Sequence, residues 1–175
     1  LGKQFHQIHH FTAIPYTAIA SFMRELTEAE GLGATALQFT ILTVVRTSEA
    51  LNARMDEFDL ENCVWTIPAE RMKARKEHRV PLSQPAIDIV MSFQQHQISD
   101  YLFPSPKGNK PLSNNVMLAT IKRMGRKGEF TVHGMRSAFR DWAAEQTDVS
   151  REVAEAALAH TIPDAVERAY RRGDL

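Results

Sequence analysis

One apolar stretch, residues 34–45 (ATALQFTILTVV), constrains the fold more than any other feature of the chain. If this stretch is helical, apolar side chains fall on nearly every side of the helix, and a helix without a polar face is normally buried. We therefore expect residues 34–45 to form the central helix of a domain. The chain has 175 residues, of which 43% are apolar, so it is long enough to build one globular domain around that helix.

Helical periodicity appears on both sides of this segment. Residues 14–31 place Ile19, Phe22, Met23 and Leu26 on one face. Ser113, Ser150 and Pro163 are typical first residues of later helices. Further helices are predicted at 47–55, 84–97, 113–125, 133–146, 150–160 and 163–172.

Between these helices the pattern changes to short β-type runs. CVWTIPA (63–69), RMKAR (71–75) and HRVPLS (78–83) are separated by polar residues that are typical of turns. The simplest arrangement is a small antiparallel sheet. The predicted fold class is therefore mainly α with a small three-stranded antiparallel sheet (α+β).

Composition and charge exclude several classes of protein. No apolar run reaches 18 residues and the first 30 residues lack a signal-peptide pattern, so we expect no membrane association. A single cysteine, Cys63, forms no internal disulfide and no metal motif, which favours a reducing cytoplasm.

The net charge is zero, but basic residues are concentrated in two segments, 71–79 and 107–127. Together these segments hold 11 of the 21 Lys and Arg residues and one of the 21 Asp and Glu residues. If they fold side by side, a neutral protein acquires one positive face, and otherwise they are two solvated surface segments. Candidate DNA contacts in them are Arg71, Arg75, Lys76, Arg79, Lys107, Lys110, Lys122 and Arg123.

Six residues capable of chemistry lie off the apolar faces of the predicted elements: Arg46, Lys73, His133, Arg136, His160 and Tyr170. No carboxylate–histidine spacing accompanies them, so a metal site is not indicated. The set suits a phosphodiester, because arginine and histidine donate to phosphate oxygens, a tyrosine oxygen can act as nucleophile and a lysine can protonate a leaving group.

Two of these residues raise a specific question. His133 and Arg136 open a helix, and cations at a helix N-terminus are unfavourable unless an anion binds there. The same helix carries an apolar stripe of Met135, Phe139, Trp142 and Ala143, which predicts that the tryptophan is buried. The pattern therefore indicates an anion site at the beginning of a packed helix.

Each candidate also has an ordinary structural explanation. Arg46 could pair with Glu49 three residues later, and Lys73 could be one solvated base among five. Arg136 could pair with Asp141 or Glu129. His133 and His160 could cap helix ends, and Tyr170 could be a half-buried core tyrosine.

The order of the motifs resembles that of the tyrosine recombinase (phage integrase) family. VVRTSEAL, VWTIPAERMKARKEHRVPLS, HGMRSAFRDWAAE and LAHTIPDAVERAYRRGDL follow one another as in prophage and genomic-island integrases, over about residues 13–172. The departures are Ser48 and Ala159, where the family often has glycine, and a spacing from His160 to Tyr170 one residue longer than the commonest one.

The resemblance implies a role for each candidate. Arg46 and Arg136 match the two family arginines, and His133 and His160 the two histidines that accompany them. Tyr170 matches the nucleophile. Lys73 matches the lysine that the family carries in a β-hairpin. Lys76 is its rival, and Lys73 is preferred because a residue held in a strand is better placed than one at the tip.

The implied activity is site-specific DNA recombination through a 3′-phosphotyrosyl intermediate, with no metal or other cofactor. The implied partners are double-stranded DNA attachment sites and, in a full-length bacterial or phage-encoded protein, three further copies in a homotetramer. The alternatives are a DNA-binding remnant without chemistry and a type IB topoisomerase. We expect residues 1–12 to be a linker remnant and 13–175 a catalytic domain lacking its core-binding domain and C-terminal tail, monomeric as a fragment.

Overall fold

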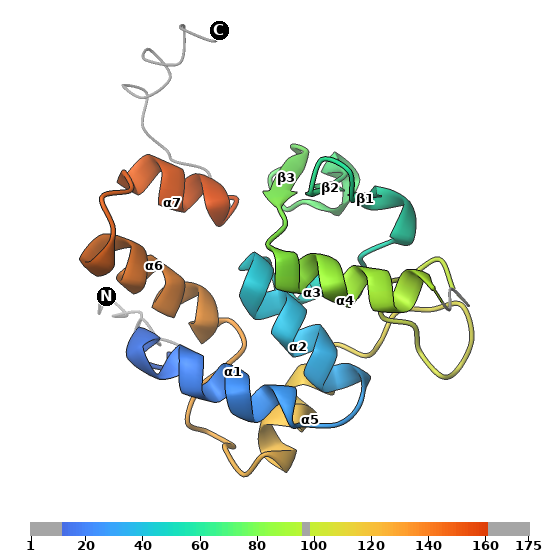
Figure 1. Ribbon diagram of the computed structural model, residues 1–175, viewed down its shortest axis with the longest axis horizontal. Helices are drawn as coiled ribbons and strands as arrows, with labels where there is room; N and C mark the ends of the chain where they lie inside the picture. Colours follow the sequence, from blue (N-terminus) through green and yellow to red (C-terminus); the bar gives the residue numbers. More distant parts are fainter. Residues whose placement is uncertain (1–11, 96–98, 161–175) are drawn as a thin grey trace, which may run out of the picture.

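The computed structural model describes residues 12–95 and 99–160, which form a mostly helical domain with a small sheet (Figure 1). Three short 3-10 helices accompany the other elements, at Tyr16–Ala18, Met55–Glu57 and Ala69–Arg71. The helices and strands are α1 (Ile19–Thr27), α2 (Leu32–Thr43), α3 (Thr47–Leu51), β1 (Phe58–Asp59), β2 (Val64–Ile67), β3 (His78–Pro81), α4 (Gln84–Gln94), α5 (Val116–Arg123), α6 (Gly134–Gln146) and α7 (Arg151–Ala157).

Helix α2 occupies the centre, as its apolar composition predicts. It packs against α1, α3, α4 and α5, and Leu37 and Phe39 are completely buried. The contact with α5 is close at Gly33, where an added Cβ would lie 2.6 Å from Thr120 Oγ1. Only glycine allows the two helices to approach this far.

The sheet has the predicted number of strands but not the predicted segments. Its order is β1-β2-β3, and both neighbouring pairs are antiparallel. The prediction of a strand at residues 71–75 is wrong, because the chain turns there: the Met72 amide donates to Ala69 and the Arg75 amide to Met72. The third strand is instead β1, which pairs Phe58 with Trp65.

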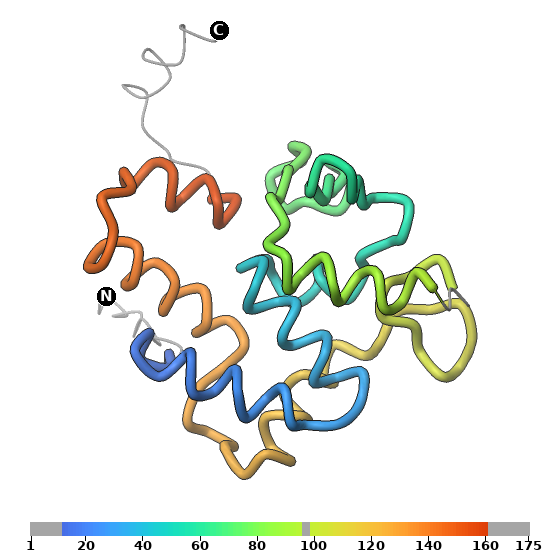
Figure 2. Tube along the Cα trace, in the orientation of Figure 1, coloured from blue at the N-terminus to red at the C-terminus, as the bar shows by residue number. Residues whose placement is uncertain are grey.

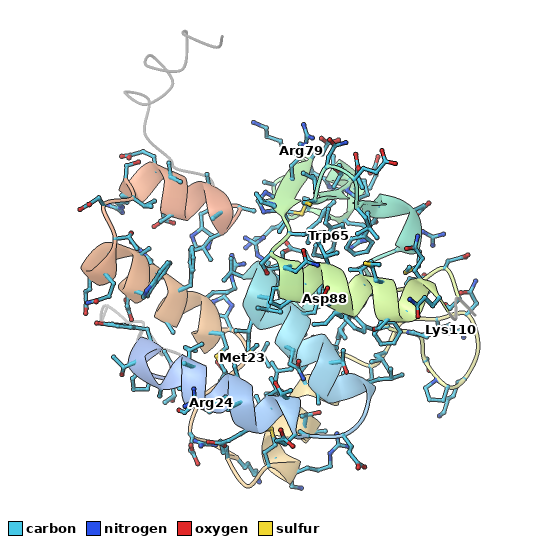
Figure 3. All side chains as sticks on the ribbon, viewed as in Figure 1. Met23, Arg24, Trp65, Arg79, Asp88 and Lys110 are labelled. Carbon is cyan, nitrogen blue, oxygen red and sulfur yellow. The ribbon has the colours of Figure 1, made fainter. Side chains whose placement is uncertain are left out.

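An aromatic cluster attaches the sheet to α2. The Trp65 ring is completely buried beneath the strands (Figure 3), 5.4 Å from the rings of both Phe39 and Phe58. Its indole nitrogen donates to Glu57 over 2.9 Å. Because aromatic side chains contribute large buried areas, this cluster holds the sheet against the central helix.

The trace in Figure 2 shows α6 and α7 on one side of α2 and the sheet on the other. Helix α6 packs on the first 3-10 helix, and Gly134 at its start is in close contact with Thr12. An added Cβ there would lie 2.5 Å from the Thr12 carbonyl oxygen. This contact anchors the beginning of α6 to the segment that precedes the first 3-10 helix.

Of the other predictions about the helices, the structure confirms one and contradicts two. Ser150 caps α7 as predicted, accepting from the Val153 amide, whereas α5 follows Asn115 rather than Ser113. The prediction that Trp142 is buried is wrong, because its side chain is 44% exposed while Met135 and Ala143 are buried. The predicted helix at 163–172 lies outside the described residues, as does the predicted linker at 1–12 except for its last residue.

Across residues 12–95 and 99–160, no helix combines the length and the apolarity that a membrane span requires.

Candidate active site

The guanidinium of Arg136 joins three elements at one point. Arg136 lies in the first turn of α6 and is 5% exposed. It donates to the Val44 carbonyl at the end of α2 and, over 2.5 Å, to the Leu158 carbonyl at the end of α7. The same Nη2 atom lies 3.2 Å from His160 Nε2. The ion pairs with Asp141 or Glu129 considered from the sequence are not among the contacts of Arg136 in the described part of the chain.

Arg136 is an electrostatically costly residue in this position. Burial first, and then the charge of Arg46, lower its pKa to about 10 against the opposing effect of Glu49. Its Nε donor is buried without an acceptor among the described residues, and such a donor costs about 1–3 kcal/mol. A positive charge held in this way is most easily compensated by an anion.

Arg46 also contacts the backbone at the end of α7. It connects α2 to α3, where its Nη1 atom lies 2.7 Å from Glu49 Oε1 and its amide donates to Glu49 Oε2 over 2.8 Å. The pairing with Glu49 that the spacing suggested is therefore present. Its Nη2 atom also reaches the Ala159 carbonyl at 3.4 Å, so the two arginines contact adjacent carbonyl groups.

The turn that carries these carbonyls has a defined geometry. The amide of His160 donates to the Glu155 carbonyl and the amide of Ala159 donates to the Ala156 carbonyl, each over 2.9 Å. These two bonds form a Schellman motif, with Ala159 left-handed at φ 49°. The motif directs the end of α7 at Arg46 and Arg136.

His160 lies at the end of this turn, between an acid and an arginine. Its Nδ1 atom is 2.6 Å from Glu155 Oε2, and its Nε2 atom faces Arg136. Glu155 is 7% exposed and its other oxygen is 3.1 Å from Arg140 Nε.

His133 immediately precedes α6 and belongs to the same cluster. Its side chain is exposed, but partial desolvation lowers its pKa, and the charges of Arg136, Arg46 and His160 lower it further. Four of the six predicted residues, Arg46, His133, Arg136 and His160, therefore converge from three different segments.

Comparison with known proteins shows the family to which a chain with this arrangement belongs. The model of the phage integrase family matches residues 12–174, which is nearly the whole chain. The chain belongs to the phage integrase family.

Relatives within this family include prophage integrases. Over 136 residues the chain is 39% identical to prophage integrase IntA of Escherichia coli K12, covering 77% of this chain and 33% of that protein. It is 34% identical to prophage integrase IntZ of the same strain, over 93% of this chain and 41% of that protein. The integrase of phage P4 is 33% identical over 92% of this chain and 41% of its own length. The chain spans between a third and about two fifths of these relatives.

Solved structures show the same fold at low sequence identity. The XerA recombinase matches with a TM-score of 0.67 and 15% identity, over 99% of this chain and 68% of that chain. A lambda integrase dimer bound to a COC′ core site matches with a TM-score of 0.66 and 14% identity, over 99% and 52% of the two chains. A lambda integrase tetramer bound to a Holliday junction matches with a TM-score of 0.65 and 13% identity, over 89% and 49%.

The integrase fold brings a further residue to the site that the sequence analysis did not select. His78 begins β3, and its pKa is lowered mainly by burial, while Glu49 and a hydrogen bond to the Ala157 backbone raise it. Arg136 and Arg46 lower it in turn. The sequence carried a signal, because His78 is two residues from buried Val80 and so shares its face of the strand.

Lys73 is in a different environment from the one expected. It lies in the turn between β2 and β3 rather than in a strand, and its side chain is exposed, like that of Lys76. It follows Met72, which is 3% exposed. The expectation that Lys73 is held by a strand is therefore wrong, although its neighbour is anchored in the core. Tyr170 lies outside the described residues.

Arg71 is occupied within the domain. Its guanidinium pairs with Glu57 and donates to the Glu49 carbonyl over 2.6 Å, and its side chain is 18% exposed. The guanidinium of Arg71 is therefore engaged inside the domain rather than available for a DNA contact. The remaining candidate DNA contacts are all exposed: Arg75, Lys76, Arg79, Lys107, Lys110, Lys122 and Arg123.

The two basic segments do not fold side by side. Figure 3 places Arg79 on the sheet at the top of the molecule and Lys110 on the loop at its right edge, and Figure 1 places α5 at the bottom. Helices α2 and α4 lie between the sheet and α5 (Figure 1).

Proposed function

We propose that this chain carries the catalytic centre of a site-specific DNA recombinase that integrates and excises a prophage or genomic island. The observation that carries the proposal is the convergence of Arg46 and Arg136 on adjacent carbonyl groups of the turn that holds His160. Two guanidinium groups and a histidine at one point suit an anion with several oxygens. In this family the anion is the scissile phosphate of DNA.

The proposed role of the cluster is electrostatic. Charge accumulates on the non-bridging oxygens as the phosphorus becomes pentacovalent, and preorganised donors stabilise that state more than the ground state. Arg46 and Arg136 neutralise this charge, and His133 and His160 donate to the same phosphate. The burial of Arg136 supports this role, because charge interactions are stronger away from water.

The proposed reaction proceeds through two balanced transesterifications. The Tyr170 oxygen attacks phosphorus as its proton passes to water, the bond to the 5′ oxygen breaks, and Lys73 protonates that oxygen. A 3′-phosphotyrosyl ester results, which conserves the energy of the phosphodiester. A 5′-hydroxyl from the partner strand then attacks this ester and releases Tyr170. No metal or other cofactor takes part in these steps.

The proposed partners are double-stranded DNA attachment sites and further copies of the full-length protein, assembled as a tetramer. Relatives named as prophage integrases and the lambda integrase tetramer on a Holliday junction support this assembly. The proposed location is the bacterial cytoplasm, where such DNA is accessible.

A nicked suicide substrate tests the proposal. Cleavage releases a short oligonucleotide that diffuses away, so a covalent protein–DNA adduct accumulates and is detected by denaturing electrophoresis. Wild-type protein is expected to form the adduct, and Tyr170→Phe is expected to form none while binding DNA within a few-fold of wild type. Binding without an adduct would indicate a DNA-binding remnant. Relaxation of supercoiled DNA without any requirement for a second site would indicate a topoisomerase.

A further inference from the structure

We propose that Glu155 is a positioning residue that fixes the tautomer of His160 and directs its Nε2 atom to the phosphate site beside Arg136. This inference rests on the proposed function for its catalytic consequence. The geometry behind the inference involves four side chains, those of Arg140, Glu155, His160 and Arg136.

The carboxylate of Glu155 is fully engaged. Oε2 lies 2.6 Å from His160 Nδ1 and Oε1 lies 3.1 Å from Arg140 Nε. The hydrogen bond from His160, together with the charges of Arg140, His160 and Arg151, lowers the pKa of Glu155 against the opposing effect of burial. Glu155 is therefore ionised at neutral pH and can only accept hydrogen bonds.

The ionised carboxylate determines which nitrogen of His160 carries the proton. A group that only accepts requires a donor opposite it, so Nδ1 is protonated. In the neutral ring, Nε2 is then the acceptor, and the Nη2 donor of Arg136 lies opposite it at 3.2 Å. The donor and acceptor sequence runs consistently from Arg136 through His160 to Glu155.

A phosphate bound beside Arg136 would change what Nε2 must do. To donate to a phosphate oxygen, the ring must also be protonated at Nε2 and become an imidazolium. Neighbouring cationic groups oppose this second protonation of the ring. They are Arg136 and His133 at the start of α6, Arg46 at the start of α3, Arg140 and Arg151 near the carboxylate, and His78 on β3 when it is charged. Glu155 is the carboxylate that directly contacts the ring, so it stabilises the imidazolium as the phosphate arrives.

Glu155 also holds the backbone of His160. The Glu155 carbonyl accepts the His160 amide over 2.9 Å in the Schellman motif. Substitution by glutamine keeps this backbone bond and the side-chain volume, so it isolates the contribution of the second carboxylate oxygen.

Glutamine cannot satisfy both partners. Its amide has one acceptor oxygen, whereas Arg140 Nε and His160 Nδ1 each present a donor. If the oxygen faces Arg140, the amide NH₂ faces Nδ1 and forces the Nε2-protonated tautomer. That tautomer places a donor against the donor of Arg136 and displaces the ring.

The experiment compares wild type, Glu155→Gln and the control Glu152→Gln, which changes an exposed acid on the same helix. The tautomer of His160 is read from its ring ¹⁵N shifts by NMR in the 175-residue chain. Adduct formation on the suicide substrate is measured in parallel. We expect the Nδ1-protonated tautomer in wild type and Glu152→Gln and its loss in Glu155→Gln. We also expect an adduct rate reduced about 10- to 100-fold in Glu155→Gln, with DNA affinity within about threefold.

An unchanged tautomer in Glu155→Gln, or an adduct rate within about twofold of wild type, would overturn the inference. If wild type forms no adduct, the proposed function fails, while the NMR measurement still decides the role of Glu155. If Glu155→Gln does not fold, Glu155→Asp is used for both readouts, because it keeps the charge but withdraws it from Nδ1 by one methylene. Wild-type behaviour in Glu155→Asp would then overturn the inference.

Discussion

Two residues beside the candidate site adopt left-handed backbone conformations although neither is glycine. They are Val44, with φ 48°, and Ala159, with φ 49°. Their carbonyl groups accept from Arg136 and Arg46 respectively. A left-handed conformation costs about 1–2 kcal/mol for a residue with a Cβ, and such strain is concentrated at functional sites. At this scale the backbone is strained where it meets the arginines.

Substitutions of Ala159 test this strain. Ala159→Gly removes the Cβ that opposes the left-handed conformation, so we expect the free energy of unfolding to stay constant or rise by up to about 1 kcal/mol. Ala159→Val adds a branched side chain and is expected to lower it by about 1–2 kcal/mol. Denaturant titration measures both. If Ala159 were in an ordinary helical conformation, Ala159→Gly would instead destabilise the protein by about 0.5–1 kcal/mol.

A lysine substitution tests the proposed general acid. Lys73 follows buried Met72 and is two residues from Arg71, which is held by Glu57, whereas Lys76 is further from this anchor. We expect Lys73→Ala to slow adduct formation by about 10²- to 10⁴-fold. A substrate with sulfur as the leaving 5′ atom should restore the rate, because sulfur leaves without needing a proton. Rescue of Lys76→Ala instead would transfer the role to Lys76.

At the scale of elements, the position of α7 against β3 and α6 determines the site. The carboxyl end of α7 points towards β3 in Figure 1, and His78 of β3 hydrogen-bonds to the Ala157 backbone. On its other side, α7 is connected to α6 through the ion pair of Arg140 with Glu155. The helix that carries His160 is therefore held from two directions.

This packing has a pH dependence with a definite sign. Burial lowers the pKa of His78 below its usual 6.5, so between the two values the unfolded chain binds more protons than the folded one. The contribution of His78 to the folding stability is therefore fully present above about pH 6.5, and it is lost as the pH falls towards the lower pKa of the folded state. We expect the melting temperature to fall less for His78→Gln than for wild type between about pH 7.5 and about pH 5.5. Equal losses would show that His78 does not contribute to this dependence.

At the scale of the whole molecule, the two basic segments that carry the proposed DNA contacts lie apart, so we expect them to contribute to DNA binding independently. The exposed bases between β2 and β3 and those of α5 lie at opposite ends of the domain (Figure 1). Contacts to the DNA backbone at separate places contribute independently to the binding free energy, whereas the residues of one continuous patch would contact the same phosphates.

A double-mutant cycle tests this separation. Arg75→Ala with Lys76→Ala forms one pair, and Lys122→Ala with Arg123→Ala forms the other. We expect each pair to weaken DNA binding, the losses in binding free energy to add within about 0.5 kcal/mol, and the salt slope to fall by about 0.9 for each phosphate contact removed.

The control is Arg24→Ala, which removes an exposed base of α1 outside both segments. It is expected to leave affinity within about twofold. Strong non-additivity of the two pairs would show that both bind the same stretch of DNA.

The effect of a chelator also belongs to this scale. Among residues 12–95 and 99–160 no group of three histidine, cysteine or acidic side chains is placed to hold a metal ion, and in the proposed mechanism the arginines neutralise the phosphate instead. We expect EDTA to leave adduct formation unchanged. Loss of the adduct in EDTA and its recovery with Mg²⁺ or Zn²⁺ would contradict the proposed mechanism.

Local pattern was sufficient for the features that depend on neighbouring residues. The all-round apolarity of residues 34–45 determined a buried central helix, and Ser150 determined the beginning of α7, because burial pattern and capping are properties of a few adjacent side chains. The helical period of the residues that follow Met135 likewise indicated a helix that His133 and Arg136 open. The order of the motifs was sufficient to predict the family.

Tertiary structure decided everything that depends on which distant segments meet. Residues 71–75 have the composition of a strand, but turn hydrogen bonds and the anchoring of Arg71 to Glu57 prevail over that propensity. Trp142 follows an apolar stripe but remains exposed, since no described element covers it fully. His78 and Glu155 join the site because the end of α7 lies close to β3 and because α7 packs on α6. The charge and burial that surround a side chain there are set by residues far away in the sequence.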